Sequence, residues 1–169
     1  MEIDKSEQKL FEYTLRSLGA RDQTSAEIAK KLTKRGAAND VISRIIDRLT
    51  HAGILADQAY AERFIQRRGE SRGKRQLAAE LRNKGLDPVE TLAKRTDEDE
   101  VTAATHTLRK RIGSKSIPTD YQDRQKLSAY LARRGFTFTS IRSAWHNVVT
   151  NDDLNWLELD DLDEPDTAC

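Results

Sequence analysis

The chain has 169 residues, and 37% of them are hydrophobic, which gives about 60 apolar side chains for one compact domain or a short array of repeats. Three prolines and eight glycines are too few for a turn-rich all-β fold, and no apolar run is long enough for a transmembrane helix. The polar first residues predict no secretory signal peptide, and the single cysteine, Cys169, excludes a disulfide framework and favours a reducing, cytoplasmic location.

The formal net charge of +1 conceals an uneven distribution of charge. Eight carboxylates and no cation lie between Asp152 and Asp166, whereas the residues before Asp152 carry 29 cations and 20 carboxylates, a net charge of +9. A basic body predicts an anionic partner, such as nucleic acid or an acidic protein surface. Because the acidic tail has little helical periodicity, we expect it to be mobile or loosely docked.

A repeat of about 50 residues organises the chain. Three glycines lie 49 and 50 residues apart, and each follows a cation, with a leucine four residues before it and an aliphatic residue eight before it. The glycines are Gly36, Gly85 and Gly135, the cations Arg35, Lys84 and Arg134, and the leucines Leu32, Leu81 and Leu131. A glycine in this position supplies the left-handed residue that ends a helix.

Apolar spacing predicts three helices in each repeat. They run over 6–19, 24–35 and 39–52, then 57–69, 74–84 and 88–96, and finally 98–112, 120–134 and 138–150. The corresponding domains are 1–55, 56–96 and 97–150, followed by the acidic tail 151–169. Thr91 and Arg95 replace apolar residues of the other repeats, so the last helix of the second repeat should be shorter or less buried. The predicted fold class is therefore all-α, with three tandem three-helix repeats forming an elongated, curved modular array.

Several local signals mark the helix starts and the connections. Thr24 with Glu27, and Thr119 with Gln122, have the spacing of capping boxes. Asp87 and Pro88 are predicted as N-cap and first helical residue. The acidic run 97–100 is interpreted as the solvated first turn of a helix, where carboxylates suit the helix dipole, and 113–118 as an exposed loop.

No pattern typical of an enzyme is present. The sequence lacks a Walker loop, the GxGxxG and GxSxG motifs, and a cysteine with a plausible base partner. Its three histidines stand alone, and the run 97–100 lacks the spaced glycine of a calcium loop. We therefore expect a binding protein that is not an enzyme and that uses no cofactor and no metal.

Segments in all three repeats share the order and spacing of one known family. They are 16–22, 25–32, 53–64, 67–85 and 126–145, and they include the run Gly53-Ile54-Leu55-Ala56-Asp57. Over residues 10–150 the chain resembles the RecX family of bacterial recombination regulators. The family usually has two acids after the leucine of this run, and here Ala56 takes the first place. Asp57 is retained and is expected to cap the next helix.

The resemblance implies an all-α modular protein that binds the filament of the RecA recombinase on single-stranded DNA. Members of the family lie in the filament groove, obstruct filament growth and reduce ATPase, strand-exchange and co-protease activity, which places them in DNA recombination, DNA repair and the SOS response. The expected protein is a monomer that contacts single-stranded DNA weakly or through the filament and binds no membrane. The alternative is a stand-alone DNA-binding protein with helix-turn-helix-like three-helix units.

Two basic segments are the predicted contacts with filament or DNA. The first contains Arg63, Arg67, Arg68, Arg72, Lys74, Arg75, Arg82 and Lys84, and the second contains Arg109, Lys110, Arg111 and Lys115. Arg63 and Arg67 share a helix face, as do Arg68 and Arg72 if their helix continues that far. The competing interpretation is an ordinary solvated surface. For the repeated cations before the three glycines, a structural role at the helix C-terminus is favoured over partner binding.

Aromatic residues divide into two groups. Tyr60, Phe64, Phe136 and Trp145 occupy repeat-equivalent apolar positions and are predicted to lie in the core. Tyr121 and Phe138 fall outside this pattern and are predicted as exposed contacts.

Overall fold

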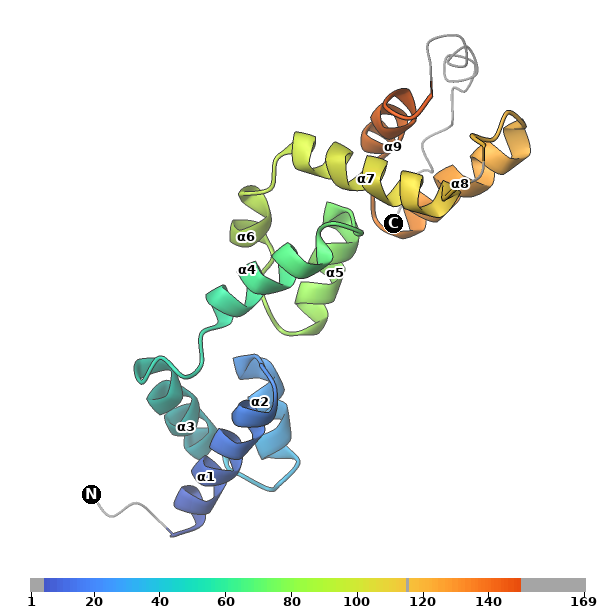
Figure 1. The fold of residues 1–169 in the computed structure, drawn as a ribbon. Coiled ribbons are helices and arrows are strands. Elements are labelled where there is room, and N and C mark those ends of the chain that lie inside the picture. Colours follow the sequence, from blue (N-terminus) through green and yellow to red (C-terminus); the bar gives the residue numbers. More distant parts are fainter. Residues whose placement is uncertain (1–4, 115, 150–169) are drawn as a thin grey trace, which may run out of the picture. The chain divides into compact units, whose positions relative to one another are not determined.

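The computed structural model describes residues 5–114 and 116–149, and within these ranges it contains only α-helices (Figure 1). They are α1 (Lys5–Ala20), α2 (Ser25–Thr33), α3 (Asn39–His51), α4 (Asp57–Arg68), α5 (Lys74–Asn83), α6 (Val89–Ala93), α7 (Asp97–Ile112), α8 (Tyr121–Arg133) and α9 (Phe138–His146). The all-α prediction is confirmed. Among these helices none is both long and apolar enough to cross a membrane. Lys115 and the acidic tail lie outside the described residues.

The three repeated glycines end α2, α5 and α8 in the same way. Their φ angles are 80°, 75° and 83° for Gly36, Gly85 and Gly135. In each case the backbone N–H of the residue that follows the glycine donates to the carbonyl of the leucine that lies four residues before the glycine, at 3.1, 3.0 and 3.3 Å. All three leucines are fully buried. This is the hydrogen-bond pattern of a Schellman motif, and it confirms the predicted helix ends.

The predicted helix starts are partly corrected. Thr24 and Glu27 form the expected capping box. The box predicted at Thr119 is wrong, because the side chain of Asp120 caps α8 by accepting from the Asp123 N–H at 3.2 Å. The prediction for α6 is shifted by one residue, since Pro88 is its N-cap and Asp87 accepts from the Val89 N–H at 3.0 Å. With five residues, α6 is shorter than the other helices, as predicted.

The chain divides into two compact units, and the division passes through α5 after Leu77. The first unit contains residues 5–67 and 78–94, and the second contains 68–77 and 95–149. One core consists of Ile28, Leu32, Ile42, Ile45, Leu49 and Leu55, and the other of Ala103, Ala104, Leu108, Ile112, Leu131, Phe136, Ile141, Ala144 and Trp145. The four aromatic residues predicted as core are buried, and Tyr121 and Phe138 are 45% and 54% exposed, as predicted.

In the first unit, residues of the second repeat (56–96) bind the N-terminus of α2. The Thr24 hydroxyl donates to the Lys84 carbonyl at 2.7 Å, and the Ser25 N–H donates to Asp57 Oδ1 at 2.9 Å. The expected role of Asp57 is therefore corrected. It is the first residue of α4, and its carboxylate satisfies a backbone N–H of α2, which would otherwise lack an acceptor within its helix.

In the second unit, the segment between α4 and α5 is fixed by Arg95, which precedes α7, and by Arg134 of the third repeat. The Arg95 and Arg134 guanidiniums donate to the carbonyls of Gly69 and Ser71, at 2.8 and 3.1 Å. The Gly73 N–H in turn donates to the Arg134 carbonyl at 2.9 Å. These bonds replace the intrahelical bonds that the segment cannot make after α4 ends at Arg68.

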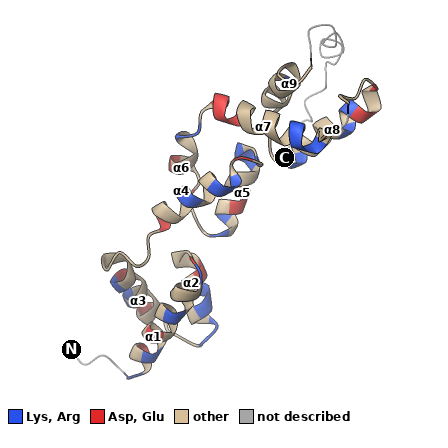
Figure 2. Ribbon diagram, in the orientation of Figure 1, with Lys and Arg blue, Asp and Glu red and all other residues tan. Residues whose placement is uncertain are grey.

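The acidic run at the start of α7 is only partly solvated. Asp97, Glu98 and Asp99 are exposed, and Asp99 forms a capping box with Thr96 (Figure 2). Glu100, in contrast, is 1% exposed, and its Oε1 accepts from the Thr137 N–H at 3.3 Å. The interpretation of the whole run as a solvated turn is wrong for Glu100, because helical rotation turns this position toward α9.

Candidate partner-binding surfaces

The predicted cations are distributed over both units. Arg63, Arg67, Arg82 and Lys84 belong to the first unit, whereas Arg68, Arg72, Lys74, Arg75, Arg109, Lys110 and Arg111 belong to the second. Lys115 lies outside the described residues. The basic segment from 63 to 84, which is continuous in the sequence, is therefore not a single surface of one unit.

Two of the cations in the first unit already have partners within it. Arg63 Nη2 lies 3.2 Å from Asp22 Oδ2, and Lys84 Nζ lies 3.0 Å from Glu27 Oε1 and 5.3 Å from the centre of the Tyr60 ring. Contacts with Tyr60 and Glu27 raise the pKa of Lys84. Arg67 and Arg82 are exposed and make no side-chain contact of this kind with the described residues. Among the predicted contact residues of the first unit, Arg67 and Arg82 are therefore the ones available to a partner.

The second unit shows the same division. Lys74 Nζ is paired with Asp97 at 2.8 Å, Arg109 donates to the Asn147 carbonyl at 2.9 Å, and Arg111 lies over the Tyr130 ring. Arg75 and Lys110 are exposed and have no such side-chain partner among the described residues.

The predicted helical pairing of Arg68 with Arg72 is wrong. Arg68 is the last residue of α4, and Arg72 lies in the connection before α5, where it is half-buried. The two side chains therefore do not share a helix face.

The three cations before the repeated glycines contact tyrosines. The Arg35 guanidinium lies 3.6 Å from the centre of the Tyr13 ring, and that of Arg134 lies 4.8 Å from the Tyr130 ring, in addition to the Lys84 contact with Tyr60. Cation–π contacts of this kind contribute about 0.5–1 kcal/mol at exposed sites. They support the structural interpretation of these repeated positions.

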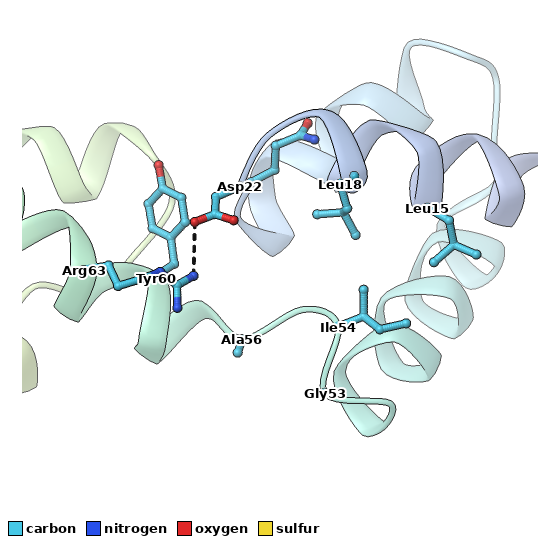
Figure 3. A pocket seen from close by; sticks show the side chains of 10 residues that line it. Leu15, Leu18, Asp22, Gly53, Ile54, Ala56, Tyr60 and Arg63 are labelled. Carbon is cyan, nitrogen blue, oxygen red and sulfur yellow. Dashed lines mark hydrogen bonds and ion pairs between the residues drawn. The ribbon is translucent and has the colours of Figure 1, made fainter.

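A pocket of about 360 Å³ lies in the first unit, between α1, the connection before α4, and α4 itself (Figure 3). Ile54 faces Leu15 and Leu18 across it, and the Asp22–Arg63 ion pair lies at its other end. Ile54 is 49% exposed, so the pocket has an accessible apolar wall. Sequence reasoning missed it because its lining comes from segments about 40 residues apart; the one available signal was the Gly53-Ile54 run.

Within the residues that the structure describes, no three His, Cys, Asp or Glu side chains are arranged to hold a metal ion. What the described surfaces offer is a set of exposed cations and a pocket with both polar and apolar lining, which are features for binding a partner.

Comparison with known proteins identifies the fold and the family. The model for RecX, first three-helix domain, matches residues 11–49, and that for RecX, third three-helix domain, matches residues 97–145. The crystal structure of RecX from Lactobacillus salivarius superposes with a TM-score of 0.70 at 23% identity, covering 86% of this chain and 98% of that one. This likeness supports the three-helix repeat fold.

Sequence relatives extend the match over most of the chain. Regulatory protein RecX of Mycobacterium sp. (strain KMS) is 36% identical over 140 residues, which cover 78% of this chain and 76% of the relative. Regulatory protein RecX of Mycobacterium leprae (strain Br4923) is 38% identical over 133 residues, covering 75% and 78%. With two matching domain models and relatives of this similarity and coverage, the chain belongs to the RecX family of regulatory proteins.

Proposed function

We propose that this protein inhibits the RecA recombinase by binding in the groove of the RecA filament on single-stranded DNA. The observation that carries the proposal is the 36% identity over 140 residues to a protein named Regulatory protein RecX. RecA is the partner that the family resemblance implies. Occupying the groove would obstruct filament growth and thereby reduce ATPase, strand-exchange and co-protease activity.

The exposed cations support this proposal because a filament of protein on DNA is anionic wherever phosphates or carboxylates are accessible. Arg75, in the second unit, and Arg82, in the first unit, are both exposed. Together with Arg67 and Lys110 they are the predicted contact residues that have no competing side-chain partner among the described residues. We therefore assign them the larger share of partner binding.

The proposed inhibitor works alone and without chemistry of its own. The protein acts as a monomer in the cytoplasm, has no catalytic activity, and serves DNA recombination, DNA repair and the SOS response. It touches single-stranded DNA weakly or through the filament. The three repeats 1–55, 56–96 and 97–150 are its binding modules.

A binding and activity experiment tests the proposal. Binding is measured to RecA alone, to single-stranded DNA alone, to duplex DNA and to the assembled filament, and the DNA-dependent ATPase of RecA is followed at substoichiometric amounts of the protein. We expect preference for the filament and a slower ATPase, because blocking growth at one end affects many subunits. Tight sequence-specific duplex binding, or an unchanged ATPase where filament binding is established, would contradict the proposal.

Charge reversal tests the assigned residues. Arg75→Glu with Arg82→Glu should weaken filament binding by about 1–3 kcal/mol, because exposed ion pairs are individually weak and add up only as a group. The control is Lys9→Glu with Lys30→Glu, which makes the same change in charge at exposed lysines of α1 and α2. Circular dichroism should show unchanged helix content in both variants. Equal effects of the two pairs would show that net charge alone, and not the positions of Arg75 and Arg82, determines binding.

A further inference from the structure

The exposed face of α9 carries a phenylalanine, an arginine and a histidine side chain. Phe138 is 54% exposed, and Arg142 and His146 follow at intervals of four residues, so the three lie along one side of the helix. None of them makes a side-chain hydrogen bond, ion pair or ring contact with the described residues. A large apolar group beside an arginine with no partner among the described residues is typical of a binding surface.

Arg109 of α7 lies at the C-terminal end of α9. Its guanidinium donates to the Asn147 carbonyl at 2.9 Å, which places it one residue beyond the end of the helix. Between Phe138 and His146 the sequence contains no carboxylate, and Figure 2 shows no acidic residue on this helix. The α9 face, defined by Phe138, Arg142 and His146, therefore carries the Arg142 charge with no carboxylate on its own helix, and Arg109 adds a second positive charge near the helix end.

We propose that the α9 face binds residues 152–161 of this same chain. This segment contains five carboxylates and no cation, and four large apolar residues are interspersed among them, namely Leu154, Trp156, Leu157 and Leu159. Carboxylates complement Arg142 and Arg109, and an apolar side chain of the segment covers Phe138. The segment thus matches the face in both charge and apolar character.

The length of chain permits this contact. The described chain ends at Val149, which is buried and whose N–H donates to the Trp145 carbonyl in the last turn of α9 at 2.9 Å. Phe138 lies about 12 Å along the helix from His146, at 1.5 Å per residue. The seven residues from Val149 to Trp156 span at most about 23–25 Å when extended. A segment tethered so close to its binding site has an effective concentration in the millimolar range, so weak contacts suffice.

The consequence for regulation rests on the proposed function. Arg109 is one of the residues predicted to contact an anionic partner, and carboxylates of the tail beside it would compete with that partner. The docking itself requires no partner and is tested without one.

Paramagnetic relaxation in the full-length protein tests the docking. Cys169 is the only cysteine, so Cys169→Ser with Asn155→Cys allows a nitroxide to be attached at position 155, next to Trp156. We expect the strongest broadening of backbone amide signals at residues 138–147. The broadening should decline several-fold when salt is raised from about 0.05 M to about 0.5 M, because screening shortens the range of the charge attraction.

Two variants and one mixing control complete the experiment. Arg142→Glu and Phe138→Ser should each reduce the broadening at α9 several-fold, whereas Lys30→Glu, an equal change in charge on α2, should leave it unchanged. Even broadening over the whole surface, or a maximum elsewhere, would overturn the proposal, as would equal effects of Arg142→Glu and Lys30→Glu. Broadening that appears when spin-labelled protein is mixed with unlabelled, isotope-enriched protein would also overturn it, because a second copy would then be the occupant.

Discussion

Gly36 and Gly135 have nearly the same backbone conformation but different surroundings. Their φ angles are 80° and 83°, a region that costs an L-residue roughly 1–2 kcal/mol. A Cβ at position 36 would meet no atom within 4 Å, whereas a Cβ at position 135 would lie 2.3 Å from the Gln76 backbone nitrogen. Gly135 therefore permits a close approach of two backbone segments in the second unit.

This difference predicts unequal effects of two identical substitutions. Gly36→Ala should lower the free energy of unfolding by about 1–2 kcal/mol, the cost of the backbone conformation alone. Gly135→Ala should lower it by more, because the segment around Gln76 must also move. Urea denaturation of both variants measures the two losses. Equal losses would show that this segment moves away at no cost.

Glu27 predicts a dependence of stability on pH. Burial raises the pKa of its carboxyl, but hydrogen bonds from Lys84 and from the Thr24 N–H outweigh burial and hold the pKa below its usual 4.5. A group with a depressed pKa stabilises the fold above its unfolded pKa, and this contribution is lost as the pH falls through the folded pKa.

The test compares the wild-type protein with Glu27→Gln. At neutral pH the wild-type protein should be more stable, because the glutamine cannot form the ion pair with Lys84. The difference in unfolding free energy should decrease as the pH falls below about 4.5, the ordinary value. Thermal unfolding of both proteins over a pH series measures this difference in unfolding free energy. A difference that is constant with pH would mean that the ionised carboxylate contributes nothing.

At the scale of elements, a buried carboxylate joins α7 to α9. Glu100 is 1% exposed and accepts from the Thr137 N–H, and Thr137 is the N-cap residue of α9. Arg95 is partly buried in the same unit, and burial lowers its pKa while the Glu100 carboxylate opposes this effect. One side chain thus serves both the start of α9 and the charge balance before α7.

Glu100→Ala should therefore be much more disruptive than its neighbour Glu98→Ala. Removing Glu100 leaves a buried N–H without its acceptor, which costs about 1–3 kcal/mol, and leaves Arg95 with less compensation for its partial burial. Glu98 is exposed, and its replacement should change stability by no more than about 0.5 kcal/mol. Chemical denaturation and hydrogen exchange at the start of α9 measure the effect. A small loss with Glu100→Ala, or unchanged exchange at Thr137, would contradict this role.

At the scale of the whole molecule, the acidic tail opposes a basic body. Deleting residues 152–169 changes the formal net charge from +1 to +9. The truncated protein should associate faster with an anionic filament, mainly at low salt, where the Debye length is about 10 Å or more. Association rates of both proteins over a salt series measure the effect. If truncation leaves the low-salt rate unchanged while the reversals at Arg75 and Arg82 still weaken binding, the tail does not regulate association.

The sequence by itself determined the all-α class, the three-helix repeat, the ends of α2, α5 and α8, and the capping box at Thr24. It also identified the buried aromatic residues and the family. These features depend on apolar periodicity and on hydrogen bonds between residues at most about five apart, so they can be read from a short window. The choice between Thr119 and Asp120 as the N-cap of α8 failed because both residues are good caps and local preference separates them poorly.

The elongated, curved arrangement of the repeats stays a prediction. Small-angle scattering should give a radius of gyration above the ~16 Å of a compact chain of this length.

Only the tertiary structure decided which charged side chains are already engaged. Asp57 serves α2, Glu100 is buried against α9, and Lys84 is held by Glu27 and Tyr60. In the same way, the pocket beside Ile54 exists only because two separate segments, 15–23 and 53–63, meet. The physical reason is that these contacts join residues about 24–57 positions apart, whose separation in space is set by helix packing. The composition around each residue carries no information about that distance.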